Sequence, residues 1–145
     1  MPFARPNSDT TIGNYTDQAG GTTNIYNAID DSATNDTDYI RSPAAPANEV
    51  YVTKLSSIAD PGVSTGHILR YRYQKDATGG GQIDLTIQLR QGYVSEATQG
   101  TLIHSETITN IQNNWTTGTF TLTAVETDSI TNYADLYWRI VANQI

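Results

Sequence analysis

The eight residues from Ile83 to Arg90 place the strongest constraint on how this chain can fold. Aliphatic side chains alternate strictly with polar or charged ones, in the order Ile83, Asp84, Leu85, Thr86, Ile87, Gln88, Leu89 and Arg90. A period of two is the repeat of a β-strand, whose successive side chains point to opposite faces. The segment therefore predicts a strand with one face in a core and the other in water, as antiparallel sheets commonly have.

Several other segments carry strand signals, and turn residues such as Asp60-Pro61-Gly62 and Gly79-Gly80-Gly81 separate them. Strands are predicted at residues 39–42, 49–56, 68–74, 101–108, 117–123 and 136–141. A single helical turn is predicted within residues 124–133, with Thr123 as its cap and Glu126 in a capping box. Short strands at this spacing predict an all-β fold, an antiparallel β-sandwich of jelly-roll type.

The expected core consists of the apolar positions that share one phase along those strands. It comprises Leu69, Tyr71, Ile83, Leu85, Ile87, Leu89, Phe120, Leu122, Trp138 and Ile140. One domain is expected for 145 residues. Residues 1–21 are expected to form an irregular N-terminal arm or first short strand, and residues 22–145 the sandwich. Two apolar islands, 12–15 and 25–29, predict short strands or an arm with irregular links.

Charge and composition exclude several classes of function. The net charge is −7 and the pI about 4.5, so the surface repels phosphate backbones and nucleic-acid binding is not expected. The absence of cysteine excludes disulfides and thiol catalysis. No apolar stretch is long enough to span a bilayer, and residues 1–8 do not resemble a signal peptide. We therefore expect a soluble protein made in the cytoplasm, without membrane contact.

No catalytic or metal-binding pattern stands out, so we predict neither an enzyme nor a cofactor. His67 and His104 lack metal-ligand spacing and are interpreted as ordinary strand residues, with His104 opposite in phase to Ile103. The acidic stretch of residues 30–38 could chelate calcium through its carboxylates, but its spacing does not match a calcium-binding loop. Turn formation by Asp and Asn is the favoured alternative there. The acidic residues are Asp30, Asp31, Asp36 and Asp38.

Aromatic residues offer candidates for an interface or a sugar-stacking platform. Alternation along the strands suggests that Tyr51 and Tyr137 face outward, which makes them interface candidates. Core packing is the favoured interpretation for Trp115 and Trp138.

Eight segments along nearly the whole chain follow one another in a characteristic order of strand and turn residues. The strings Gly66-His67-Ile68-Leu69-Arg70-Tyr71-Arg72-Tyr73 and Trp115-Thr116-Thr117 are two of them. The others lie at residues 5–9, 25–31, 36–40, 83–90, 122–130 and 133–136. Similar strings occur in phage head-decoration (cement) proteins and in domains attached to phage tail proteins. The resemblance implies a jelly-roll domain on the virion, usually a homotrimer, and brings no catalytic residues with it.

A cement protein is the favoured role, because a tail protein usually carries such a domain within a longer chain. The expected partner is the major capsid protein, bound on the outer surface of the assembled head. The alternative is a carbohydrate- or receptor-binding module of a phage tail, which would use exposed aromatics. The N-terminal segment is expected to help grip the capsid or an adjacent subunit. Its candidate contact residues are Phe3, Arg5, Ile12 and Tyr15.

Overall fold

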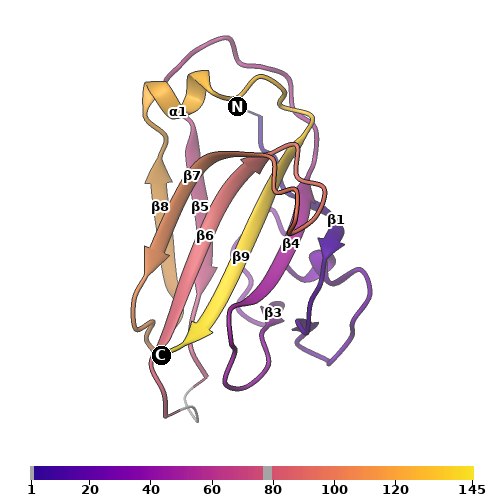
Figure 1. The fold of residues 1–145 in the computed structure, drawn as a ribbon, viewed down its shortest axis with the longest axis vertical. Coiled ribbons are helices and arrows are strands. Elements are labelled where there is room, and N and C mark those ends of the chain that lie inside the picture. Colours follow the sequence, from indigo (N-terminus) through magenta and orange to yellow (C-terminus); the bar gives the residue numbers. More distant parts are fainter. Residues whose placement is uncertain (1, 77–79) are drawn as a thin grey trace.

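The alternating segment forms β6 (Ile83–Gln91), which lies inside a five-stranded antiparallel sheet in a computed structural model describing residues 2–76 and 80–145. The strand order is β1-β4-β9-β6-β7 (Figure 1). The other members are β1 (Pro6–Thr11), β4 (Glu49–Leu55), β9 (Leu136–Gln144) and β7 (Thr101–Ile108). We call this layer the large sheet.

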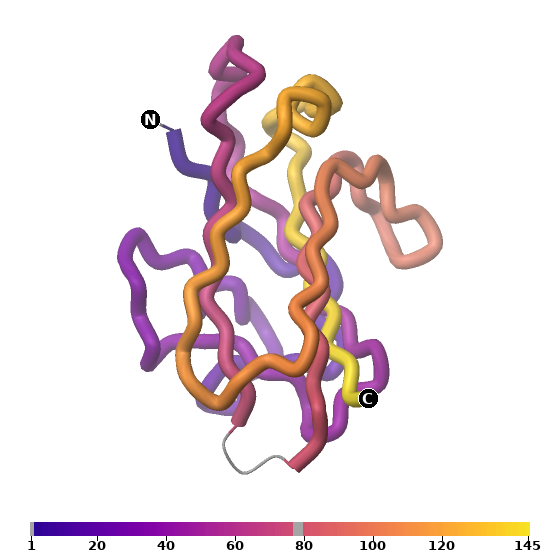
Figure 2. The backbone as a smooth tube through the Cα atoms, turned by 90° about the vertical axis from the view of Figure 1, so that its left-hand side faces the viewer, coloured from indigo at the N-terminus to yellow at the C-terminus, as the bar shows by residue number. Residues whose placement is uncertain are grey.

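A second layer faces the large sheet but contains fewer strands. It consists of an antiparallel ribbon of β5 (Ile68–Tyr73) and β8 (Thr116–Thr121), beside a short pair of β2 (Thr16–Asp17) and β3 (Ile40–Arg41). Figure 2 shows the ribbon and the large sheet as two separate layers. The predicted antiparallel β-sandwich is therefore confirmed. Its jelly-roll strand order remains a prediction, because the second layer consists only of these two-stranded pieces in the described residues.

The predicted strands are present, with ends that shift by a few residues. On β6, Ile87 and Leu89 are 4% and 3% exposed, which confirms the inward phase of the alternation. The predicted helical turn is α1 (Ala124–Asp128). The hydroxyl of Thr123 accepts a hydrogen bond from the Glu126 N–H at 3.3 Å, and the Glu126 carboxylate accepts the Thr123 N–H at 2.7 Å. This is the predicted capping box.

The first forty residues differ from the expectation in two places. The first strand lies at Pro6–Thr11 and pairs with β4, whereas residues 12–15 form a turn after it. The second apolar island forms a 3-10 helix, η1 (Ile25–Ala28), and not a strand. The cause is Asp9 on β1, whose carboxylate accepts the N–H groups of Ile25 and Tyr26 at 2.9 and 3.0 Å. These bonds satisfy the free donors at the start of a helical turn.

Two further expectations concern local geometry. A register shift in the pairing of β6 with β7 places both Ile103 and His104 in the interior, although they are neighbours in the chain. The expectation that His104 is opposite in phase to Ile103 is therefore wrong, since a β-bulge inserts an extra residue and re-aims the side chains. Of the turn predicted at residues 75–81, which contains the three glycines, residues 77–79 lie outside the described residues, as does Met1.

The core consists of three separate clusters. One lies at the α1 end of the sandwich, which we call the closed end; its buried members are Leu55, Leu89, Ile103, Leu122, Ile130, Tyr133 and Leu136. A second, near η1, contains Tyr15, Ile25, Tyr51 and Ala142. The third, Val52, Tyr93 and Tyr137, lies on the outer face of the large sheet. The strand residues between the first two clusters are less well covered, and they form the candidate site.

Candidate functional site

A large cleft of about 2040 Å³ lies between the inner face of the large sheet and strand β5. We call it the inter-sheet cleft. The inner face of the large sheet supplies one wall, which includes Thr53, Leu85, Ile87, Trp138 and Ile140. Of these, Leu85, Trp138 and Ile140 are only partly buried. The cleft is therefore an accessible apolar surface inside the sandwich, built from residues that the alternation assigned to the core.

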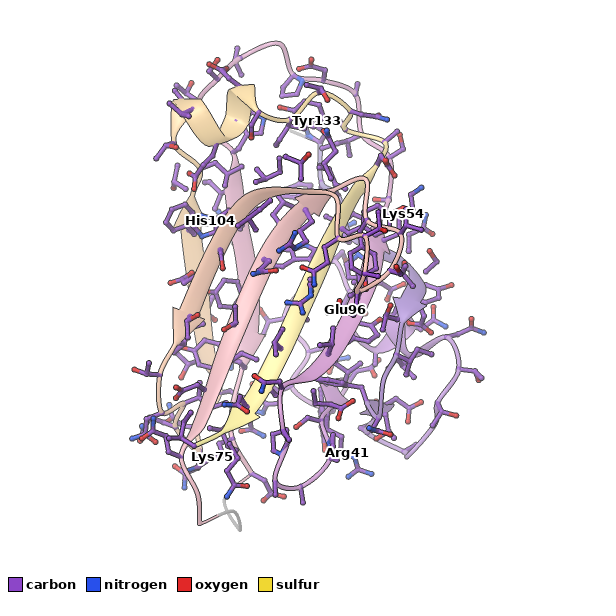
Figure 3. All side chains as sticks on the ribbon, viewed as in Figure 1. Arg41, Lys54, Lys75, Glu96, His104 and Tyr133 are labelled. Atoms are coloured by element: carbon purple, nitrogen blue, oxygen red, sulfur yellow. The ribbon has the colours of Figure 1, made fainter. Side chains whose placement is uncertain are left out.

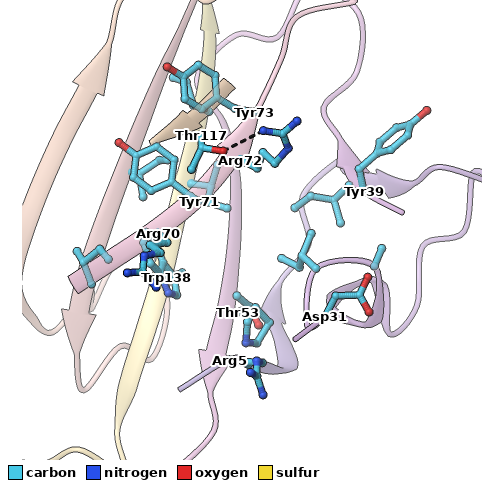
Figure 4. Close-up of a pocket in the computed structure, with 18 of the residues that line it drawn as sticks. Arg5, Asp31, Tyr39, Thr53, Arg70, Tyr71, Arg72, Tyr73, Thr117 and Trp138 are labelled. Carbon is cyan, nitrogen blue, oxygen red and sulfur yellow. Dashed lines mark hydrogen bonds between the residues drawn. The ribbon is translucent and has the colours of Figure 1, made fainter. Parts of the chain in front are cut away.

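Strand β5 supplies the opposite wall. Every residue from Thr65 to Asp76 lines the cleft, whereas β8 contributes only Thr117. Inward side chains on β5 include Tyr71, whose ring lies 6.1 Å from that of Trp138 in an edge-on arrangement (Figure 4). Gly118, opposite Tyr71 on β8, makes room for this ring, because a Cβ at that position would lie 2.1 Å from it. Tyr71 thus reaches across the interior and links the two layers.

A cluster of aromatic and charged side chains stands at the mouth of the cleft. Arg72 forms a bidentate pair with Asp36, at 2.5 and 2.7 Å, and also donates to the hydroxyl of Thr117 at 2.9 Å. Its guanidinium lies 5.8 Å from the ring centre of Trp115, which in turn packs against Tyr39 at 5.8 Å. The hydrogen bonds between them lower the pKa of Asp36 and raise that of Arg72. We call these five residues the mouth cluster.

Charge is distributed unevenly between the cleft and the remaining surface. Five of the eight cationic residues line or border the cleft, against four of the fifteen acidic ones. The rest of the molecule therefore carries three cations and eleven acids. In a protein of net charge −7, the cleft is the region most favourable to an acidic partner. The cationic residues are Arg5, Arg41, Arg70, Arg72 and Lys75.

Two of the predicted contact residues, Phe3 and Arg5, stand at the border of the cleft. Phe3 is 57% exposed, and the Arg5 guanidinium lies 5.5 Å from the centre of its ring. The Arg5 backbone is tied to Ser56, because its N–H donates to the Ser56 hydroxyl at 3.1 Å and its carbonyl accepts the Ser56 N–H at 2.7 Å. The Arg5 backbone is therefore held in place next to the cleft, and Phe3 lies two residues before it.

The other predicted contact residues are covered by the protein itself. Ile12 is partly buried and packs against the cluster that contains Tyr15 and Tyr51. The outward orientation expected for Tyr51 is wrong: it is 0% exposed on the inner face, and its hydroxyl donates to Asp9 at 2.8 Å. Tyr137 does lie on the outer face of the large sheet, but Tyr93 packs over it and leaves it 8% exposed. Alternation indicated the face of Tyr137 but not the loop that covers it.

The two histidines take part in structural contacts near the closed end. His104 stacks on Phe120 with ring centres 3.6 Å apart and lies 2.8 Å from the Glu126 carboxylate. His67 lies 2.8 Å from the Tyr133 hydroxyl, and Figure 3 shows His104 and Tyr133 toward the α1 end of the sandwich. No group of metal-ligating side chains that could hold an ion occurs among residues 2–76 and 80–145.

Sequence reasoning did not identify Trp138, Arg70 and Asp36 as parts of an accessible site. The sequence assigns Trp138 to the core and Asp36 to a turn. In the structure, Trp138 also lines the accessible cleft, and Asp36 also pairs with Arg72 at its mouth. One signal could have pointed to β5, since Arg70 and Arg72 alternate there in a chain that has only eight cations. Nothing in the local sequence indicates that, among the described residues, β5 pairs with β8 alone.

Comparison of the chain with protein-family models, curated proteins and solved structures finds no significant match. Within the part of the chain that the structure describes, neither helix is long and apolar enough to cross a membrane.

Proposed function

We propose that this protein is a capsid decoration (cement) protein, which binds the outer surface of an assembled phage head and stabilises contacts between major capsid subunits. The proposal combines the resemblance of the sequence segments to head-decoration proteins with one structural observation. That observation is the inter-sheet cleft, an accessible apolar surface of a kind that marks an interaction site in proteins. The protein would be made in the host cytoplasm and would act on the virion.

The mechanism is thermodynamic linkage. A protein that binds only the assembled lattice lowers the free energy of that state and leaves the free subunits unchanged. The head then resists expansion and rupture in proportion to the occupancy of its binding sites. The acidic surface is compatible with this location, since the packaged DNA lies on the other side of the shell.

Binding to heads that lack the protein is the direct test. Purified protein is mixed with undecorated heads, and co-sedimentation is measured together with the temperature at which the heads release DNA. We expect saturable binding and a higher release temperature. Protein that neither sediments with the heads nor changes their stability contradicts the proposal.

We also propose that the protein acts as a homotrimer, the state that the family resemblance implies. Exposed apolar side chains outside the cleft, such as Leu102 and Val94 at 47% and 70%, are available for contacts between subunits. Light scattering on the free protein and reconstruction of decorated heads measure the state. A monomer both in solution and on particles contradicts this proposal.

A carbohydrate- or receptor-binding module is the second candidate, and the mouth cluster supports it. Half-buried aromatic rings beside a charged pair are suited to stacking on a sugar and bonding to its hydroxyls. A glycan array separates the candidates: specific glycan binding that Trp115→Ala abolishes, without any binding to heads, favours the second. Thr119→Ala, on the exposed face of β8, is the matched control.

A further inference from the structure

Strand β5 has one free edge. The carbonyl of His67 accepts a hydrogen bond from Leu122 on the β8 side at 2.9 Å, and the Lys75 N–H donates to Gln112 on the same side at 2.8 Å. Backbone groups of successive strand residues point to opposite edges. Ile68, Arg70 and Arg72 therefore direct their N–H and C=O groups away from β8, and no other described residue hydrogen-bonds to those groups.

This edge opens on the inter-sheet cleft. All the residues of β5 line the cleft, and the partly buried Trp138 and Ile140 lie on the wall opposite. In a two-layer sandwich, this is the position where a further strand of the second layer would cover the large sheet. Edge strands with exposed backbone groups are templates for pairing with another chain.

The charges along the edge indicate what such a chain carries. Arg70 and Arg72 are two residues apart, so both point to the outer face of the ribbon. Asp36 of this chain pairs with Arg72, whereas no described residue pairs with Arg70. A neighbouring strand presents its side chains beside those of β5, and opposite charges in such cross-strand pairs are favourable. An acidic side chain of the added strand would form with Arg70 the kind of ion pair that Asp36 forms with Arg72.

We propose that the cleft receives an extended segment of the major capsid protein, which pairs with the free edge of β5 as an additional strand. Alternate apolar side chains of that segment pack on Trp138 and Ile140, and the intervening positions carry an acidic residue beside Arg70. A segment of about six residues, or roughly 20 Å, spans the edge. In naming the capsid protein as the source of this segment, the inference rests on the proposed function; the binding mode does not.

A synthetic peptide tests this strand-addition binding mode in the absence of capsids. The probe is an acetylated and amidated seven-residue peptide in which Val and Glu alternate, and amide hydrogen exchange in the protein is followed by NMR. We expect the amides of Ile68, Arg70 and Arg72 to become protected. The amides of Leu69 and Tyr71 already face β8 and should not change. Protection confined to other regions overturns the proposal.

Two control peptides separate backbone pairing from charge. The same peptide with alternate backbone nitrogens methylated cannot pair along one edge, and it should bind about tenfold more weakly, as expected for the loss of one or two hydrogen bonds. A peptide with Lys in place of Glu should also bind more weakly. Equal binding of the methylated peptide overturns strand addition, and equal binding of the Lys peptide overturns the acidic partner.

A protein variant provides the reciprocal test. Arg70→Pro removes an N–H that points to the free edge and leaves the bonds to β8 in place, whereas Arg70→Thr keeps that N–H and removes only the charge. We expect Arg70→Pro to lose peptide binding and Arg70→Thr to weaken it. If Arg70→Pro fails to fold, the comparison of the methylated with the unmethylated peptide on the wild-type protein still tests strand addition.

The same experiments distinguish this inference from the proposed function. If the protein decorates heads and Arg70→Pro decorates them equally well, the function stands and the strand-addition mode is wrong. If the peptide binds as described but heads are not decorated, the mode stands with another partner. Protection of the edge amides that rises with protein concentration alone assigns the cleft to a second copy and overturns the inference. Glycan binding without peptide binding also overturns it.

Discussion

The closed end and the inter-sheet cleft are built from the same strands, yet they differ in how well they are covered. On β6, Leu89 at the closed end is 3% exposed, whereas Leu85 in the cleft is only partly buried. On β9, Leu136 is 5% exposed and Trp138 is partly buried. The alternation is identical in both regions, so the difference comes from the facing layer.

The covering layer at the closed end is the segment that joins β8 to β9. It contributes Leu122, Ile130 and Tyr133 to the buried cluster, and α1 holds its path. Over the cleft, the facing layer is the ribbon of β5 and β8, whose free edge leaves the wall accessible. The closed end is therefore the better packed of the two regions, and the side of the cleft is the more accessible one.

The largest expected effect concerns the boundary between these regions. Ile87→Asp places an unpaired charge at a position that is 4% exposed, and it should prevent folding. Thr86→Asp, one residue away on the outer face, is the matched control and should fold. Circular dichroism and thermal melting check both variants. A soluble Ile87→Asp protein with a cooperative transition contradicts the assignment of this face.

A pair of truncations compares the two regions directly. Leu89→Ala removes a fully packed side chain and should lower the free energy of unfolding by about 2–5 kcal/mol. Leu85→Ala removes a side chain that already contacts solvent, and it should cost about 1 kcal/mol. Urea unfolding measures both. Equal losses in the free protein would show that the cleft is as tightly packed as the closed end.

The pH dependence of stability sharpens the description of the closed end. Burial raises the pKa of Glu126, but hydrogen bonds from His104 and Thr123 outweigh it and lower that pKa below the ordinary 4.5. A lowered carboxyl pKa contributes stability above the unfolded-state value, and this contribution is lost as the pH falls through the folded-state pKa.

Glu126→Gln should therefore be less stable than the wild type by about 1 kcal/mol near pH 7, with a difference that shrinks below about pH 4.5. Urea unfolding across this range measures the difference between the two proteins. A difference that does not depend on pH contradicts the role assigned to the charged carboxylate.

The smallest expected effect lies at the cleft. The pair of Asp36 with Arg72 is accessible to solvent, with side chains 37% and 31% exposed, and such pairs contribute little to stability. Asp36→Asn should shift the melting temperature less than Glu126→Gln does. A larger shift in the melting temperature of Asp36→Asn would mean that this ion pair stabilises the fold around the mouth of the cleft.

Much of the architecture could be predicted from local pattern, and the errors have physical causes. The alternation from Ile83 to Leu89 and the capping box of Thr123 and Glu126 were predicted correctly, because both depend on residues close in sequence. Ile25 was assigned to a strand or an arm because its helical turn depends on Asp9, sixteen residues earlier. His104 was placed in the wrong phase because a bulge cannot be recognised from one strand alone.

The candidate site could be predicted only in part. Phe3 and Arg5 were chosen as an apolar anchor and a rare cation, and both border the cleft. Tyr51 and Tyr137 were chosen by alternation, which assigned the wrong face to the first and did not reveal the cover over the second.

The sequence by itself determined which residues form strands and which side chains share a face, because these properties follow from neighbours along the chain. Only the tertiary structure decided which of those faces are buried, because the segments that pack over them are far away in sequence. Trp138 carries the same pattern as Leu136, and what separates them is the position of the segment between β8 and β9. The free edge of β5 is likewise a property of the assembled layers.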